Sequence, residues 1–559
     1  MNTTKTSALT LGDPNYTTDH PFDLAIYPLP SEILLEEVFI EMRDGVRLAA
    51  NVFRVEGAEP APVIVTSTPY GKDNYDQWNY FRDAPIGNVP GGGGFYLGQV
   101  RISDRTAFEA PDPGYWVPRG YVVVLVDHPG MGRSQSNPAA DPALEDRWHD
   151  IIDWLADQPW CSGSVGMSGV SALCATQWIA AKDPAPRALK AIIPWEDFNE
   201  SGPGGGYGGI PETSFPHWLK SQWIAPNINP DGAGPERLFA WNFDTSKIGI
   251  PALICASFSD QELHTWDTFD AFTRIASKAK WLYGHRRQKW GAFYGKDELE
   301  CQKGFLDRFL KGDDSAFQNK PAVRLEVNED RFTHQVVTAD NWPLPGTSYE
   351  ALFLDAESGT LLTEQPSASV TKRVSALEAG NRDNSLTFDL KVESPTSLVG
   401  HMALRLFVET QDSNDADIFV GVEKIDVLGN KVYFFSSSGG NANGPATRGW
   451  LRLSKRKLKA ERSTEWRPVL DMASSSPVVP GHVTEVNIPL MPSGTKFHPG
   501  ETLRLVVQAW SIPGQWEGGE TRQWDTIKKG SYRIHTGPEF PSRLLVPVIS
   551  RNVGSRSQR

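Results

Sequence analysis

Residues 163–174 constrain the fold of this chain more than any other segment. They run from a stretch of small and apolar residues into a helical pattern, with Ser171 at the junction. A serine at a sharp turn between a buried strand and a helix has its hydroxyl at the edge of a sheet, and the next backbone N–H can face a developing oxyanion. Such a turn needs small neighbours, which Gly169 and Ala172 supply. We therefore predict that Ser171 is a nucleophile; the alternatives are that it only caps the helix or that Ser168 takes this role.

Composition narrows the class of protein. With 559 residues the chain is long enough for two or three domains. A net charge of −13 without clusters of Lys and Arg argues against nucleic acid as a partner. There is neither a long apolar stretch nor an apolar signal-peptide core at the polar N-terminus, so we expect a cytoplasmic protein with no membrane partner. The sequence leaves a homodimer open.

The four cysteines, Cys161, Cys174, Cys255 and Cys301, are widely spaced. That spacing fits reduced thiols and lacks the paired ligands of a zinc or iron–sulfur site. We expect no metal and no cofactor, and a small molecule or a short peptide as the substrate.

Unalternating Val/Ile runs at 62–66 and 121–127 are typical of parallel strands buried on both faces, and further strand-like runs lie at 189–194 and 250–256. A hairpin is expected around Asp44 and Gly45, and a helix over 146–157. This alternation predicts a doubly wound α/β domain, comprising 31–198 and 245–320, that binds ligands at the carboxyl ends of its strands.

Three further segments complete the predicted organisation. Residues 1–30 lack periodicity and are expected to form an N-terminal arm. The Gly-, Pro- and Trp-rich segment 199–244 is expected to be a small cap over the pocket. From 321 to 559 short alternating runs separated by turn residues predict a C-terminal β-sandwich, or jelly-roll, domain.

A serine nucleophile needs a base, and the base needs a carboxylate that fixes its tautomer. Asp260 follows one predicted strand and His285 follows the next, in the chain order serine, acid, histidine. Tyr70, just beyond an earlier strand, is a candidate oxyanion donor beside the backbone N–H of Ala172. The neighbouring residues Glu262 and Asp267 are alternatives to Asp260, and His264 is the alternative to His285.

Six stretches, spread in order over nearly the whole chain, resemble one family of serine hydrolases. This is the cocaine esterase and X-Pro dipeptidyl-peptidase group, or CocE/NonD family. The resembling stretches are residues 42–48, 68–72, 115–121, 158–167, 307–312 and 449–452.

The resemblance implies an α/β-hydrolase fold with a cap and a C-terminal jelly roll. It also implies a triad of Ser171, Asp260 and His285, with an oxyanion hole formed by Tyr70 and the amide of Ala172. The chain departs from the family pattern in three places: at Ala172, where tyrosine is usual, at Cys174, where a glycine usually completes the turn, and at Arg286, which follows His285 where glycine is common.

We therefore expect cleavage of an ester, or of an amide, through an acyl-enzyme on a fairly apolar substrate. Dipeptide release and acyl transfer would use the same triad, and a catalytically silent binding protein that uses the jelly roll is the alternative from another class. The residues expected to line the substrate pocket are Trp78, Trp195, Glu196, Phe198 and Trp218.

Overall fold

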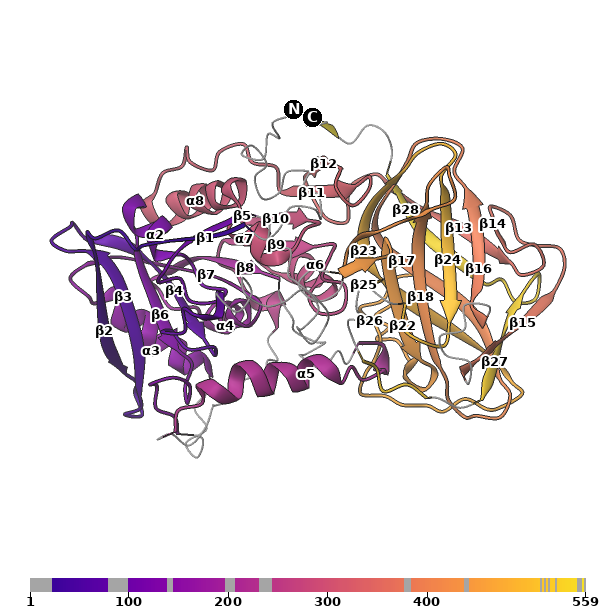
Figure 1. The fold of residues 1–559 in the computed structure, drawn as a ribbon, viewed down its shortest axis with the longest axis horizontal. Helices are drawn as coiled ribbons and strands as arrows, with labels where there is room; N and C mark the ends of the chain where they lie inside the picture. The colour runs from indigo at the N-terminus through magenta and orange to yellow at the C-terminus, as the bar shows by residue number, and fades with distance from the viewer. Residues whose placement is uncertain are drawn as a thin grey trace, which may run out of the picture.

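The computed structural model describes residues 23–78, 99–137, 144–196, 207–230, 244–376, 384–436, 442–512, 515–516, 519–520, 523–527, 530–549 and 555–556. Among these residues, no helix has both the length and the apolar character needed to cross a membrane. The molecule consists of an α/β half, on the left in Figure 1, and a β-rich half on the right.

One mixed sheet forms the centre of the α/β half. Its spatial order is β2-β3-β6-β4-β7-β8-β9-β10-β11-β12, with antiparallel pairs at both ends and parallel pairs from β6 to β11. The strands are β2 (Ile33–Glu41), β3 (Arg47–Val55), β4 (Ala61–Thr68), β6 (Val122–Asp127), β7 (Cys161–Val170), β8 (Leu189–Trp195), β9 (Ala252–Ser257), β10 (Lys280–His285), β11 (Val323–Asn328) and β12 (His334–Ala339). This order confirms the predicted α/β class.

The apolar runs of the sequence form the central strands because both faces of the sheet are covered. Every residue of β6 and β9 is buried, without the alternation of a half-exposed strand. The predicted hairpin is the β2–β3 pair, whose turn contains Gly45 at φ 81°. Sequence periodicity therefore predicted these elements correctly.

Helices cover the sheet on both sides. α8 lies above it in Figure 1 and packs on β7 and β8, whereas α3 lies below and contacts β7 and α4. The helices are α2 (Pro113–Trp116), α3 (Leu144–Ala156), α4 (Ala172–Ala180), α5 (Ser214–Trp218), α6 (Thr265–Arg274), α7 (Lys289–Phe293) and α8 (Lys296–Lys311). α5 belongs to the segment predicted as a cap, and its helix runs below the α/β half toward the near edge of the β-rich half in Figure 1.

The β-rich half is a two-layered jelly roll. Its long strand β17 pairs with β23, β27 and β28, and a second group of strands pairs as β16–β24–β18–β22. The main strands are β13 (Thr347–Asp355), β14 (Thr360–Leu362), β15 (Val370–Ser375), β16 (Leu386–Lys391), β17 (Thr396–Thr410), β18 (Asp417–Ile425), β22 (Thr447–Arg452), β23 (Val483–Phe497), β24 (Thr502–Gln508), β27 (Ser531–Thr536) and β28 (Arg543–Ile549). Apolar side chains from these strands form a core separate from that of the α/β half.

Short strands complete the description. β1 (Asp23–Tyr27), inside the segment expected to be an arm, pairs with β5 (Gln99–Ser103). The others are β19 (Lys431–Val432), β20 (Phe434–Ser436), β21 (Ala442–Gly444), β25 (Gln515–Trp516), β26 (Gly519–Glu520) and β29 (Ser555–Arg556). Strands β11 and β12, which follow the predicted domain limit at residue 320, extend the α/β sheet toward the jelly roll.

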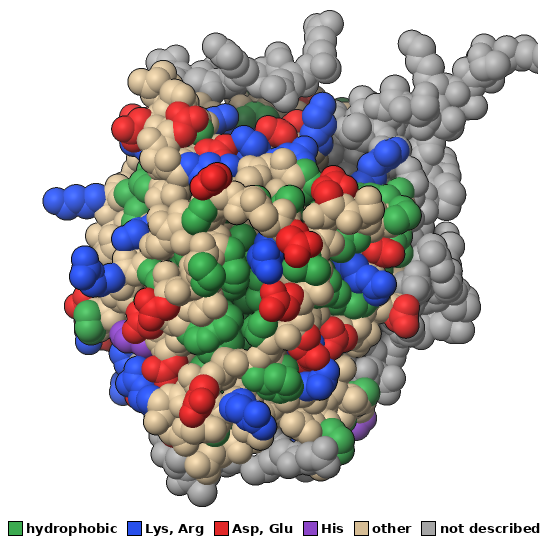
Figure 2. Space-filling view, turned by 90° about the vertical axis from the view of Figure 1, so that its left-hand side faces the viewer, with side chains coloured by type: hydrophobic (Ala, Val, Ile, Leu, Met, Phe, Trp, Pro, Cys, Tyr) green, Lys and Arg blue, Asp and Glu red, His purple; other side chains and the backbone are tan. Residues whose placement is uncertain are grey.

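Figure 2 shows the end of the molecule that carries β2 and β3. Charged side chains of both signs lie around a central group of hydrophobic ones. Strand β2, which is the outermost strand of the sheet, exposes the large side chains Leu35 and Phe39.

Candidate active site

Ser171 lies between β7 and α4 in a backbone conformation that few non-glycine residues adopt. Its φ is 58° and its ψ is −114°. Its N–H donates to the carbonyl of Trp195 at 2.9 Å, and its own carbonyl accepts from the N–H of Cys174 at 2.9 Å. Gly169, at φ 153°, has no room for a side chain, because a Cβ would lie 2.7 Å from Cβ of Leu173. This is the strained turn expected from the sequence.

The hydroxyl of Tyr70 joins Ser171 to a carboxylate. It makes hydrogen bonds to the side chains of both Ser171 and Glu109. Burial, followed by the charge of Glu109, raises the pKa of Tyr70 well above its ordinary value, so the phenol keeps its proton. The amide of Ala172 belongs to the first residue of α4 and has no acceptor within that helix. Tyr70 and Ala172 are therefore both near the nucleophile.

Glu109 was not singled out from the sequence. It lies in the loop between β5 and α2 at φ 64°, and its carbonyl accepts from the N–H of Val170 at the end of β7. Its Oε1 accepts from Nε1 of Trp290 at 2.9 Å. Burial is the largest cause of a raised pKa at Glu109, which Lys289 partly offsets.

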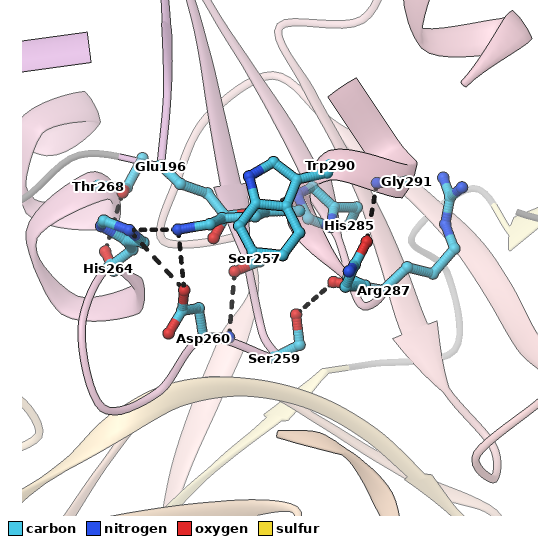
Figure 3. Close-up of polar contacts among 12 residues, drawn as sticks. Glu196, Ser257, Ser259, Asp260, His264, Thr268, His285, Arg287, Trp290 and Gly291 are labelled. Atoms are coloured by element: carbon cyan, nitrogen blue, oxygen red, sulfur yellow. Dashed lines mark hydrogen bonds and ion pairs between the residues drawn. The ribbon is translucent and has the colours of Figure 1, made fainter. Parts of the chain in front are cut away.

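Asp260 follows β9, as predicted, and is 1% exposed. Its Oδ2 lies 3.8 Å from Nε2 of His264 (Figure 3) and 3.8 Å from Nζ of Lys289. The jelly roll anchors this loop, because Gln261 donates to the carbonyl of Ala446 at 3.0 Å. The position of Asp260 thus depends on both halves of the molecule.

His285 ends β10, and its neighbours differ from those expected. Its Nε2 lies 2.9 Å from Oε1 of Glu196, and both residues are fully buried. Its ring also lies against that of Trp195, with 5.7 Å between centroids. The contacts of the described residues thus pair His285 with Glu196, and Asp260 with His264 and Lys289.

Lys289 is the first residue of α7 and is 4% exposed. Its Nζ lies 3.1 Å from Nε2 of His264 and 3.6 Å from Oε1 of Glu109. Glu196, Asp260 and His264 have ligand atoms close enough together to bind one metal ion. The ammonium of Lys289 lies against two of these three ligands, so the cluster already holds a cation, and we derive no step through a metal.

The residues predicted to line the pocket differ in their position and burial. Trp78 is 1% exposed and donates from Nε1 to the carbonyl of Thr106, and Trp195 is also a core residue. Glu196 is buried against His285. Phe198 lies outside the described residues, and Trp218 ends α5, where its side chain is not described.

The sequence did not identify Glu109 or Lys289 as site residues, for different reasons. Glu109 lies in a loop with no strand or helix pattern. Lys289 follows His285 by four residues, among other cations in the run from 286 to 289. The signal that could have found Lys289 is its place after a strand end at the carboxyl edge, the same argument that selected His285.

Family models match both halves of the chain. The model described as X-Pro dipeptidyl-peptidase (S15 family) matches residues 44–207. The model described as the X-Pro dipeptidyl-peptidase C-terminal non-catalytic domain matches residues 315–545. The curated relative named cocaine esterase, from Rhodococcus sp. (strain MB1 Bresler), is 24% identical over 92% of this chain and 98% of its own.

Solved structures agree with this assignment. A CocE/NonD family hydrolase from Staphylococcus aureus has a TM-score of 0.82 and 33% identity, over 92% of this chain and 94% of its own. An aminopeptidase from a Thaumarchaeota archaeon, with a TM-score of 0.66 and 17% identity over 96% of this chain and all of its own, shares the fold. The strained serine turn, the two matched domains and this similarity along the chain show that the protein belongs to the CocE/NonD family of serine hydrolases.

Proposed function

We propose that the protein cleaves an ester of a small, fairly apolar acid through an acyl-enzyme on Ser171. The observation that carries the proposal is the positive φ of Ser171 at the β7–α4 turn, together with its hydrogen bond to Tyr70. A strained backbone of this kind persists where the surrounding structure holds it, and it is typical of nucleophilic serines. The named esterase among the relatives supports an ester as the substrate class.

Attack by the Ser171 oxygen forms a bond to the carbonyl carbon and moves its π electrons onto the oxygen. Tyr70 and the amide of Ala172 stabilise that oxyanion. The base takes the Ser171 proton during the attack and gives it to the alcohol, which leaves as the tetrahedral intermediate collapses. Water then attacks the acyl group and releases the acid.

His285 is the proposed base. Neither ring nitrogen of His285 makes a hydrogen bond among the described residues, and its Nε2 lies 2.9 Å from Oε1 of Glu196. We propose Glu196 as the carboxylate that orients this ring, with Asp260, the acid expected from the sequence, as the alternative. Glu196→Gln and Asp260→Asn separate the two, because the substitution of the true partner should lower the acylation rate about a thousandfold or more.

Labelling with a fluorophosphonate, followed by peptide mapping, tests the nucleophile. The wild type and Ser168→Ala should carry the label on Ser171, whereas Ser171→Ala should carry none. If the folded wild type takes no label, the result favours the alternative hypothesis of a catalytically silent binding protein.

Release of an X-Pro dipeptide is the second proposed activity, because both matching family models carry the name of that peptidase. A comparison of p-nitrophenyl esters with X-Pro amides as substrates distinguishes the two. The same site would serve acyl transfer if another nucleophile replaced water.

We also propose a location in the cytoplasm, and a homodimer as one possible assembly. The four cysteines are free thiols, which supports a reducing compartment such as the cytoplasm. Light scattering of the purified protein distinguishes a monomer from a homodimer.

A further inference from the structure

Lys289 has no role in the acyl-enzyme chemistry described above, yet it is a buried ammonium group. Burial of an isolated cation is costly, so such a group is retained where its charge is compensated. Three polar groups surround its Nζ: Nε2 of His264 at 3.1 Å, Oε1 of Glu109 at 3.6 Å and Oδ2 of Asp260 at 3.8 Å (Figure 3 shows the contacts of Asp260 and His264). Lys289 therefore joins the Asp260 loop to the carboxylate that contacts Tyr70.

The Glu109 carboxylate creates an electrostatic problem for the proposed oxyanion hole. Tyr70 contacts both Glu109 and Ser171 through its single hydroxyl. That hydroxyl has one proton to donate, and an ionised Glu109 competes for it with the oxyanion. A carboxylate one hydrogen bond behind the donor also repels the developing negative charge, and this repulsion is strong in a buried site.

The ammonium of Lys289 lies on the other side of the same carboxylate. A cation there offsets the negative charge of Glu109 and weakens its hold on the Tyr70 proton, while the carboxylate still orients the phenol. The indole N–H of Trp290 has a similar effect, since it donates to the same oxygen, Oε1.

We propose that Glu109 and Lys289 are positioning residues that prepare Tyr70 for the oxyanion: Glu109 orients the phenol, and Lys289 neutralises Glu109 so that the Tyr70 proton can transfer its hydrogen bond to the oxyanion. This inference rests on the proposed function, in which Tyr70 is an oxyanion donor. It adds two residues that neither touch the reacting atoms nor belong to the triad.

The protonation of Glu109 gives the proposal a measurable pH dependence. The groups that face it are Tyr70 after β4, Lys289 and Trp290 from α7, Tyr294 just beyond α7, and Glu196 after β8. Of these, Lys289 is the cation that lowers the pKa of Glu109, so its removal raises that pKa further. Below the new pKa a neutral Glu109 leaves Tyr70 free to donate, and above it the uncompensated anion holds the phenol.

The test compares Lys289→Met, Glu109→Gln and the double variant, with hydrolysis of a p-nitrophenyl ester measured from pH 5 to pH 9. Lys289→Met should lose about tenfold or more in kcat at pH 8, with less effect on KM, and the loss should shrink as the pH falls. Glu109→Gln keeps an amide oxygen for the Tyr70 proton and should retain most of the wild-type kcat. The double variant should recover kcat and lose the added pH dependence.

Lys424→Met is the matched control, because Lys424 is an equally buried lysine that contacts Glu501 in the jelly roll, 2.8 Å away. It should lower the melting temperature and leave the pH profile of kcat unchanged. A pH-independent loss shared by Lys289→Met and the double variant would overturn the proposal, since that pattern means only structural support.

Two further readouts keep the test decisive. If Lys289→Met does not fold, Glu109→Gln alone decides, since a tenfold or larger loss of kcat there contradicts the inference. Fluorophosphonate labelling of wild-type Ser171 reports on the proposed function separately: an unlabelled wild type rejects that function, whereas labelled wild type with unaltered Lys289→Met kinetics rejects only this inference.

Discussion

Replacement of Arg448 by methionine should destabilise the protein and impair catalysis through the Asp260 loop. Arg448 lies in β22 of the jelly roll. Its Nη1 forms an ion pair with Glu262, two residues beyond Asp260. Both side chains of the pair are 4% exposed. The guanidinium also donates to the carbonyl of Ile512 at 3.2 Å and to Oγ of Ser436 at 2.6 Å. Methionine fills similar space but leaves all three acceptors without this donor.

The magnitude follows from the burial of the pair. Removal of one partner of a buried ion pair costs about 3–5 kcal/mol, because the other charge stays behind without compensation. We expect a value in the upper half of that range for Arg448→Met, since two further acceptors lose a donor. Glu262→Gln should cost about 1.5–3 kcal/mol, because the guanidinium keeps its two other acceptors. The double variant should be less destabilised than the sum, by a coupling energy of about 2 kcal/mol.

Urea unfolding of the four proteins gives these free energies, and ester hydrolysis gives kcat under native conditions. A loosened Asp260 loop should lower kcat about tenfold in Arg448→Met. Lys424→Met, which breaks a buried ion pair elsewhere in the jelly roll, should be destabilised with kcat unchanged. An Arg448→Met variant within about 1 kcal/mol of the wild type would refute the reasoning on burial, and an equal loss of kcat in Lys424→Met would refute the role of the loop.

Two other substitutions test features of the backbone and the core. Ser171→Gly should be more stable than Ser171→Ala by about 1 kcal/mol, because glycine adopts φ 58° without strain; calorimetry measures the difference, and equal melting temperatures would contradict it. Burial lowers the pKa of His401 to about 3, below its unfolded value of about 6.5. The stability present above pH 6.5 is therefore lost as the pH falls toward 3. His401→Phe should remove this loss between pH 7 and pH 4.5 in urea titrations; an unchanged acid sensitivity would rule out His401 as its source.

The sequence predicts those parts of the fold that depend on burial along one strand. The runs that became β6 and β9 are buried on both faces, so their composition alone identifies them. The turn at Ser171 is predictable because it needs small neighbours, and the structure leaves no room for a Cβ at one of them, Gly169. The strand ends that carry Asp260 and His285 follow from the same pattern.

The partners of those side chains do not follow from the pattern. Parallel strands bring Asp260 and His285 to one edge, but the direction of each side chain depends on the turn that follows its strand. Asp260 precedes α6, so its carboxylate lies beside His264 four residues later. His285 is still within β10, and its ring faces Glu196, which directly follows β8, the strand on the far side of β9.

Three residues of the site share a strained backbone conformation, which the sequence predicts at Ser171 but not at Glu109 or Glu196. Glu109, Ser171 and Glu196 all have positive φ, at 64°, 58° and 53°. Backbone hydrogen bonds connect them to the neighbouring segments: Val170 N–H to Glu109, Ser171 N–H to Trp195, and Glu196 N–H to Cys255. Each such residue costs about 1–3 kcal/mol, so their coincidence requires that the rest of the sheet hold them in place.

The strained backbone at these three residues explains why buried carboxylates lie close together beside a well-packed core. Strained backbone at the ends of β7 and β8 directs Ser171 and Glu196 toward the edge of the sheet, and the loop from β5 brings Glu109 beside them. Two carboxylates, of Glu109 and Asp260, then lie near the ammonium of Lys289, and a third, of Glu196, lies near Asp260 and His264. We therefore expect the chemistry at Ser171 to depend on the protonation of Glu109, whose pKa burial raises.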